Sequence, residues 1–357
     1  MMQSWQQCKN ILIIRADNMG DLIMSGPAIR ALKTTFSSKI TVLTSSMAAG
    51  VTPYLSEVDE IIVFDLPWIK AREVIQSDVI FDLVKQLKKK NFDAVVIFTV
   101  FSQNPLPAAM IAYMAGIPLR LAYCRENPYE LLTNWVPDKE PYTFIQHQIE
   151  RDLALVKSIG ANTTDKHLRL QISKETGEDV KTKLRNIGVD IDKQWLIFHA
   201  GVSEKKREYS AELWIDAAKK IIAEKQYQIL FTGTGSEKTM CNLLAAQVGE
   251  YSFSVAGLFK LDEFISLIKL APVVISVNTG TVHIASAVGT PIVVLYAQTN
   301  PQHTPWMVPN KVLEFAVEEQ DRSKNEVIRF MYKKFYSSPA NMPGPVDIFN
   351  AVTELLQ

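Results

Sequence analysis

The chain has 357 residues, of which 47% are hydrophobic and 21% charged, and its 38 basic and 38 acidic residues give a formal net charge of zero. This length suits two domains, and the composition is that of a folded protein rather than a disordered one. Because no net positive charge attracts polyanions, we expect no nucleic-acid partner, and any anionic ligand must be held by a local site.

Strand and helix signals alternate along the whole chain. Short apolar runs predict strands over residues 11–14, 40–43, 61–64, 94–98, 196–198, 229–232, 273–277 and 292–295. Longer helical patterns lie between them, over residues 21–35, 75–90, 106–115, 144–159, 211–224, 239–248, 261–270 and 282–288. This alternation predicts an α/β fold in which helices cover parallel sheets.

A polar stretch over residues 160–194 interrupts the alternation, which resumes at Trp195. We place the domain boundary in this stretch and predict two Rossmann-like halves, residues 1–172 and 173–357. Apolar residues at helical spacing predict a final helix within 345–357. Whether this helix packs on the second half or crosses back to the first stays open, because periodicity identifies an apolar face but not its partner.

The first predicted strand leads into the most informative loop of the first half. Its apolar run ends at Arg15, turn-forming residues follow, and Asp21 stands where the next helical pattern begins. In open α/β sheets, ligands bind at the carboxyl ends of strands, so Asp21 is a candidate site residue. An aspartate is also a common helix cap. The residues by themselves leave both interpretations open.

Basic side chains follow the strand predicted over 196–198, where Ser203 precedes Lys205, Lys206 and Arg207. A hydroxyl and several cations at the carboxyl end of a strand suit a pyrophosphate. The alternative is a solvated basic loop, which is the commoner situation of such a run.

The next strand ends in a glycine-containing loop. Gly233 and Gly235 form part of a dinucleotide-binding fingerprint whose third glycine is missing. Glu237 follows, and acidic residues in such folds often accept hydrogen bonds from ribose hydroxyls. The alternative is an ordinary glutamate at the start of a helix.

A third loop follows the strand predicted over 273–277. Asn278, Thr279 and Gly280 precede a helix whose first-turn N–H groups suit a phosphate, and His283 lies in that turn. The alternative is a turn with local caps and a histidine that bonds its neighbours. The second half thus offers groups for a nucleotide-linked donor, whereas the first half offers a carboxylate for the acceptor.

The stretches RADNMGDLIMSGPAIRAL and SVNTGTVHIASAVGTPIVVLYAQTNP resemble signatures of glycosyltransferase family 9, the heptosyltransferases of lipopolysaccharide core assembly. HQIERDLALVKSIG is similar to the family segment that closes the first domain, so the resemblance covers nearly the whole chain. It implies a GT-B fold, in which the parallel sheets of two Rossmann-like domains face an interdomain cleft. It also implies an ADP-sugar donor and a lipid-linked or glycan acceptor.

The resemblance assigns roles to individual residues. Asp21 becomes the general base, Glu237 the ribose-binding residue and Phe259 a residue lining the adenine. AGVSEKKREYSAELW resembles the donor-phosphate motif, which implies phosphate contacts from Ser203 and Arg207. The donor site predicted in this way comprises Ser203, Lys206, Arg207, Gly233, Glu237, Phe259, Asn278, Thr279, Gly280 and His283.

The chain departs from the family pattern at three places. The family usually has Asp where this chain has Asn278, Lys where it has Arg207, and Trp-Pro where it has Tyr209-Ser210. Arginine keeps the charge of lysine, whereas Asn278 keeps the shape of aspartate but removes its negative charge. We therefore keep two alternatives to heptose transfer, namely transfer from another nucleotide sugar and a non-catalytic protein that binds sugar nucleotides. A nucleotide-dependent oxidoreductase would need a complete Gly-x-Gly-x-x-Gly near the first strand, which the chain does not supply.

One carboxylate suffices as the base of an inverting, single-displacement transfer. The sequence shows no Asp-x-Asp pair at a strand end, so we expect no metal requirement and no cofactor beyond the donor substrate.

The sequence also carries signals of location. Cys8, Cys124 and Cys241 form no metal-spaced or disulfide framework, and no apolar segment resembles a secretory signal or approaches the length of a membrane span. We expect a cytoplasmic protein that, by the resemblance, works at the inner face of the cytoplasmic membrane. The basic runs at 85–90 and 328–336 either contact anionic headgroups or are solvated helix faces.

Overall fold

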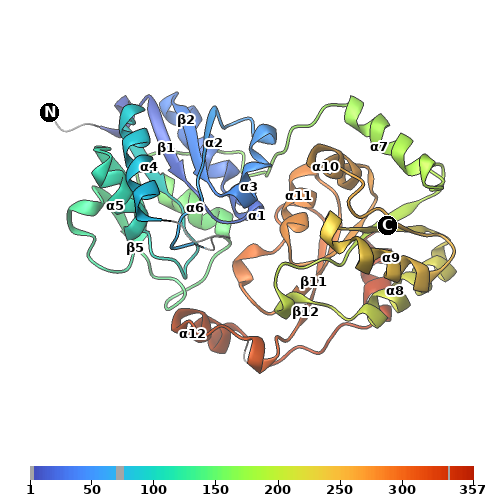
Figure 1. Ribbon diagram of the computed structural model, residues 1–357. Coiled ribbons are helices and arrows are strands. Elements are labelled where there is room, and N and C mark those ends of the chain that lie inside the picture. Colours follow the sequence, from blue (N-terminus) through green and yellow to red (C-terminus); the bar gives the residue numbers. More distant parts are fainter. Residues whose placement is uncertain (1–3, 70–75, 337) are drawn as a thin grey trace. The chain divides into compact units, whose positions relative to one another are not determined.

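The computed structural model describes residues 4–69, 76–336 and 338–357. The chain forms two compact units, residues 1–168 and 169–357, and each contains its own sheet (Figure 1). The division falls slightly before the boundary predicted after residue 172. None of the described helices is both long and apolar enough to cross a lipid bilayer.

The first unit is built on a six-stranded, all-parallel sheet in the order β3-β2-β1-β4-β5-β6. Its strands are β1 (Asn10–Ile14), β2 (Lys39–Thr44), β3 (Glu60–Val63), β4 (Ala94–Ile97), β5 (Leu119–Cys124) and β6 (Asn134–Pro137). Its helices are α1 (Met19–Met24), α2 (Gly26–Phe36), α3 (Ser46–Ala49), α4 (Ser77–Lys89), α5 (Leu106–Met114) and α6 (Gln148–Lys157). Chain order reverses between β1 and β4, and such a switch point is where ligands bind in open α/β sheets.

The second unit repeats this topology with the order β12-β11-β10-β7-β8-β9. Its strands are β7 (Trp195–His199), β8 (Gln228–Thr232), β9 (Ser252–Ser254), β10 (Val274–Val277), β11 (Ile292–Ala297) and β12 (Asn310–Phe315). Its helices are α7 (Glu175–Asn186), α8 (Ala211–Lys225), α9 (Lys238–Val248), α10 (Leu261–Leu270), α11 (Gly280–Val288), α12 (Glu326–Phe335) and α13 (Pro345–Leu355). The switch point of this sheet lies between β7 and β10.

The central strands have the continuous apolar runs that parallel sheets require, because helices cover both faces. Residues 11–13 of β1 and residues 274–275 at the start of β10 are fully buried. The strands without a sequence prediction are β5, β6, β9 and β12, and the last three are sheet edges. These three edge strands are mostly only partly buried and lack the apolar run on which the prediction depended, whereas the fourth edge strand, β3, has such a run and was predicted.

The helix predicted over 21–35 is wrong as a single element. The structure has two helices, α1 and α2, which meet at Ser25. Pro27 lies in the first turn of α2, where its missing N–H costs no helical hydrogen bond, whereas inside a continuous helix it would remove one. The helix predicted over 144–159 begins later, at Gln148, and residue 75 of the helix predicted over 75–90 lies outside the described residues.

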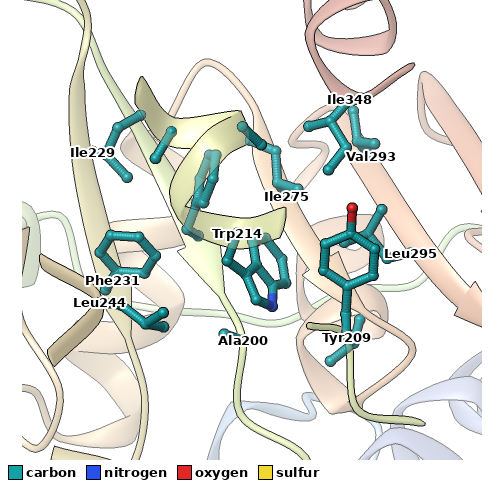
Figure 2. Packing of buried hydrophobic residues seen from close by; sticks show 14 of the residues in the cluster. Ala200, Tyr209, Trp214, Ile229, Phe231, Leu244, Ile275, Val293, Leu295 and Ile348 are labelled. Atoms are coloured by element: carbon teal, nitrogen blue, oxygen red, sulfur yellow. The ribbon is translucent and has the colours of Figure 1, made fainter. Parts of the chain in front are cut away.

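The core of the second unit surrounds Trp214 on α8 (Figure 2). Its ring lies edge-on to that of Tyr209, with 5.3 Å between centroids, and the Tyr209 hydroxyl donates a hydrogen bond to the Pro343 carbonyl. α13 packs on α8 and buries Ile348 and Val352 in the same core. Of the two packings left open for the final helix, the structure therefore has the one on the second unit.

Candidate functional site

The carboxyl ends of β7 and β10 come together at the switch point of the second sheet. Arg207 lies in a 3-10 turn, Lys205–Arg207, in the loop that follows β7. Its Nη1 donates a hydrogen bond to the Asn278 carbonyl, just after the end of β10, at 3.1 Å. An ion pair between Nη2 and Glu204 Oε2, at 3.2 Å, also holds the guanidinium. Arg207 is thus a cation held between two loops that the sequence had identified separately.

The N-terminus of α11 lies in the same loop as Asn278. Thr279 precedes the helix but its side chain does not cap it, so the side chain takes up none of the first-turn N–H groups. His283 is buried in the first turns, with its ring edge-on to that of His303 and 6.1 Å between centroids. A nine-residue helix with an uncapped N-terminus next to a cation is suited to an anion such as a phosphate.

The Asn278 side chain is occupied within the protein. Its Nδ2 donates to Thr299 Oγ1 at 3.1 Å and lies 3.5 Å from the Ala297 carbonyl oxygen, while its Oδ1 accepts from the Ala297 N–H at 3.3 Å. The side chain is buried and joins the end of β10 to the end of β11. An amide provides both the donor and the acceptor that this position uses, whereas an ionised carboxylate provides acceptors alone.

Glu237 lies across the ends of β7 and β8. Its Oε2 accepts from the N–H of Thr234 at 2.6 Å and from the hydroxyl of Thr234 at 2.8 Å, so Glu237 does cap a helix start. The carboxylate also passes close to Gly201, where a Cβ atom would meet Glu237 Oε1 at 2.1 Å, and a Cβ at Gly233 would meet Oε2 at 3.1 Å. The two glycines therefore make room for this carboxylate. Gly201 was missed, since one glycine carries no motif.

His199, at the end of β7, is a second residue that the sequence did not single out. Its Nδ1 lies 2.9 Å from Thr232 Oγ1. Burial lowers the pKa of His199 to about 4, although the neighbouring Glu237 acts in the opposite direction. The ring is therefore neutral at physiological pH, and it adds a hydrogen-bonding group beside Glu237 without adding charge.

Three further donor residues were predicted from the sequence, namely Ser203, Lys206 and Phe259. Ser203 is exposed in the loop after β7, and Lys206 pairs with Glu204 at 3.3 Å, as in a solvated basic loop. Phe259 lies between β9 and α10, with Lys183 Nζ 5.8 Å from its ring centre. All three follow the carboxyl ends of strands in the second sheet.

Asp21 is buried at the switch point of the first sheet. It is the third residue of α1, and its Oδ2 accepts from the N–H of Asn18 at 3.2 Å, so it does cap the helix. Its other oxygen, Oδ1, accepts from Arg15 Nη2 at 3.1 Å. Cap and ion pair therefore coexist on one carboxylate.

Arg15 is fully buried and has further acidic neighbours. Burial acts to lower the pKa of Arg15, but Asp17, Asp21 and Asp152 together raise it above its usual value. Asp17 Oδ2 lies 3.3 Å from Arg15 Nε, and burial raises the pKa of Asp17 to about 6 in spite of that arginine. Burial likewise raises the pKa of Asp152, whose Oδ2 accepts from Ser25 Oγ at 2.7 Å.

Arg15, Asp17 and Asp152 are neighbours of Asp21 that the sequence did not identify as site residues. Arg15 and Asp17 lie in the loop that it singled out, so their proximity to Asp21 was available as a signal. Asp152 comes from α6, far along the chain, and only the fold brings it to this loop. Across the described ranges, no group of three or more His, Cys, Asp or Glu side chains is arranged to hold a metal ion.

Comparisons with known proteins agree with this architecture. The sequence model of glycosyltransferase family 9 (heptosyltransferase) matches residues 80–331. Lipopolysaccharide heptosyltransferase 2 of Escherichia coli K12 is 25% identical over 308 residues, which cover 83% of this chain and 84% of that protein.

Solved structures resemble the whole chain. A family 9 glycosyltransferase from Veillonella parvula is 18% identical with a TM-score of 0.77, and the match covers 100% of this chain and 98% of that one. ADP-heptose lipopolysaccharide heptosyltransferase II of E. coli is 20% identical with a TM-score of 0.72, covering 97% and 98%. At these identities the likeness concerns the fold, and it confirms the predicted class of two Rossmann-like units with parallel sheets.

Proposed function

The chain belongs to glycosyltransferase family 9, and from this membership we propose that it transfers a heptose or a related sugar from an ADP-linked donor to a lipopolysaccharide core or a related glycan. The relatives support the sugar and the nucleotide, since one is a lipopolysaccharide heptosyltransferase and another is named for ADP-heptose. A glycosyltransferase of this kind must stabilise a departing nucleoside diphosphate and activate an acceptor hydroxyl.

The proposed binding of the donor depends mainly on one observation. The Arg207 guanidinium is held beside the N-terminus of α11. As the bond to the sugar breaks, negative charge grows on the pyrophosphate. A fixed cation and helix N–H groups stabilise that charge without having to reorganise. Glu237 would accept hydrogen bonds from the ribose hydroxyls and Phe259 would line the adenine. The remaining donor residues proposed are Ser203, Lys206, Gly233, Asn278, Thr279, Gly280 and His283.

Asp21 is the proposed general base of a single displacement that inverts the anomeric centre. The acceptor oxygen forms a bond to the anomeric carbon while the bond from that carbon to the β-phosphate oxygen breaks. The acceptor proton passes to Asp21, and the electron pair leaves with ADP. Arg15 and the N-terminus of α1 both favour the carboxylate over the acid, so Asp21 would be ionised and ready to accept the proton.

Asp21→Ala tests the base in an assay with ADP-heptose and a lipopolysaccharide-core acceptor. We expect kcat to fall by about 10²- to 10⁴-fold while ADP binding persists, because the proposed donor residues belong to the second unit. Asp21→Asn, which keeps the shape, should be equally inactive. Near-native turnover of a folded Asp21→Ala protein would refute the base assignment, and loss of folding alone would support a purely structural cap.

The nucleotide is tested separately by isothermal titration with ADP-, GDP- and UDP-sugars, followed by product analysis. We expect the ADP-sugar to bind tightest and to be consumed. Preference for another nucleotide would identify a transferase of another sugar. Binding without product would identify a non-catalytic protein that binds sugar nucleotides. We retain this alternative because Asn278 replaces the aspartate that the family usually has.

We also propose that the transfer needs no metal ion. Arg207 and the N-terminus of α11 would supply the positive charge that a divalent cation supplies in other transferases. Turnover in excess EDTA should equal turnover in Mg²⁺, and a loss that added Mg²⁺ restores would refute this point.

Peripheral contact with the inner face of the cytoplasmic membrane is proposed through α12. Phe330 and Phe335 are exposed on this helix, and Lys334 Nζ lies within 6 Å of both rings, at 5.8 and 5.4 Å. Aromatic and basic side chains on one helix suit anionic headgroups. Flotation with anionic liposomes should recover the wild type but not a Lys333→Glu, Lys334→Glu variant. An absence of binding by the wild type at physiological salt would refute the proposal.

A further inference from the structure

Two carboxylates divide the buried guanidinium of Arg15 between them. Asp17 Oδ2 lies 3.3 Å from Nε, and Asp21 Oδ1 lies 3.1 Å from Nη2. All three side chains are at least nine-tenths buried. Because little solvent screens it, the positive charge of Arg15 acts on both carboxylates. The more closely Arg15 pairs with one carboxylate, the less it stabilises the negative charge of the other.

Asp17 is held in place by a group of its own. Its second oxygen, Oδ1, accepts a hydrogen bond from the Gln103 amide, which comes from the loop after β4. The Gln103 Oε1 in turn accepts from the Val100 N–H at 3.2 Å, which fixes the orientation of the amide. The carboxylate of Asp17 is therefore fixed on two sides, by β1 through Arg15 and by the β4 loop through Gln103.

The remaining charges that face Arg15 come from α6. Asp152 accepts from Ser25 Oγ and from Gln148 Nε2, at 2.7 and 2.8 Å, and acts on Arg15 only through its charge. Arg151 also faces the group, but its guanidinium binds two other carboxylates, Asp138 and Glu140. Three carboxylates thus compete for one guanidinium, and Asp17 is the one that shares it directly with Asp21.

We propose that Asp17 is a positioning residue for Asp21, which engages the Nε edge of Arg15 and so prevents the guanidinium from fully neutralising the base. This inference rests on the proposed role of Asp21 as the general base. Without Asp17, Arg15 would pair with Asp21 alone and hold its carboxylate more firmly as the anion. Asp21 would then accept the acceptor's proton less readily, because a carboxylate stabilised by a full cation is a weaker base.

The pH dependence follows from the same geometry. Burial raises the pKa of Asp17 to about 6, with Arg15 and Gln103 acting to lower it and Asp21 and Asp152 acting to raise it. Above that pH Asp17 is ionised and shares Arg15. Below it Asp17 takes up a proton and releases Arg15 to Asp21. A plot of the rate of transfer against pH should therefore show an inflection where Asp17 ionises. Because Asp17 and Asp21 share Arg15, the two carboxylates titrate together.

The test uses the full chain carrying Asp17→Asn, with kcat and KM measured across the acidic pH range. We expect a kcat about three- to tenfold lower at neutral pH, because an Asp21 held more firmly as the anion accepts the proton less readily, and only part of that change passes into the rate. The KM for the donor should change by less than about twofold, since no donor residue is altered. The inflection due to Asp17 should disappear, so that kcat keeps its lowered value across the pH range in which the wild-type rate falls.

A second variant, Gln103→Met, keeps both carboxylates. It should move the inflection of the pH–rate profile and not remove it. Loss of the amide donor makes ionised Asp17 less stable, so its inflection should move to higher pH. The control is Glu57→Gln, which breaks another buried guanidinium–carboxylate pair of the first unit, with Arg30 Nε 2.7 Å from Glu57 Oε1. It should lower the unfolding temperature but leave kcat and the pH profile unchanged.

The outcomes separate this inference from the proposed function. An inactive Asp21→Ala together with wild-type kcat and pH profiles in Asp17→Asn and Gln103→Met would overturn the role of Asp17 alone. Near-native turnover of Asp21→Ala would overturn both. If Asp17→Asn does not fold, Gln103→Met decides, because an unmoved inflection in that variant refutes the coupling.

Discussion

Replacing Asn278 by aspartate would restore the residue that the family resemblance implies and would also disturb the link between β10 and β11. The Nδ2 group becomes a carboxylate oxygen that cannot donate. That oxygen would face the Ala297 carbonyl oxygen, now 3.5 Å from Nδ2, while the Thr299 hydroxyl can turn and donate instead of accepting. The substitution therefore leaves one buried carbonyl without its donor and places two acceptors against each other.

The expected cost follows from these contacts. Leaving a buried acceptor unsatisfied costs about 1–3 kcal/mol, and we take about 2 kcal/mol for Asn278→Asp. In a unit of this size, each kcal/mol lowers the unfolding temperature by about 2–4 °C, so a decrease of about 4–8 °C is expected. Burial also raises the pKa of a new aspartate above its unfolded value. The destabilisation is therefore complete at high pH and is relieved as the pH falls through the folded pKa, where the protonated acid can donate to Ala297.

Differential scanning calorimetry near pH 8 and near pH 5 measures both effects. The decrease in unfolding temperature, relative to wild type at the same pH, should be larger near pH 8. Asn242→Asp, on the exposed face of α9, is the matched control and should alter stability by less than about 0.5 kcal/mol. An Asn278→Asp protein as stable as wild type near pH 8 would refute the structural role of the amide.

Three further substitutions test the second unit. Gly201→Ala would place a Cβ 2.1 Å from Glu237 Oε1 and displace that carboxylate, so titration calorimetry should show ADP binding weakened by about tenfold. Unchanged affinity would argue against Glu237 as a nucleotide ligand. Tyr209→Phe removes the hydrogen bond to Pro343 and should cost about 1 kcal/mol in urea unfolding, whereas an equally stable variant would make that bond energetically neutral. Trp214→Ala empties the centre of a core and should cost about 3–5 kcal/mol, and a loss below about 1 kcal/mol would contradict the packing seen there.

The prediction of strands depended on where each strand lies in its sheet. Central strands such as β1 and β10 are covered on both faces, so their composition alone predicts them. β5 is also buried, but Arg120 interrupts its apolar run. The structure accommodates this arginine through its bonds to backbone carbonyls, among them that of Leu131 at 2.9 Å from Nε. Such partners become visible only when the chain has folded, and for that reason the pattern did not predict β5.

The amino-acid sequence by itself determined the alternation of strands and helices, the loops at the strand ends and the carboxylate at position 21. These features depend on residues close together in the chain, and periodicity and turn chemistry record them directly. Only the tertiary structure decided how Asp21 is surrounded, because Asp152 reaches Arg15 from α6 and Gln103 reaches Asp17 from the β4 loop. It likewise decided that Asn278 bonds to β11. Burial and charge sharing act between residues distant in sequence, so no local pattern encodes them.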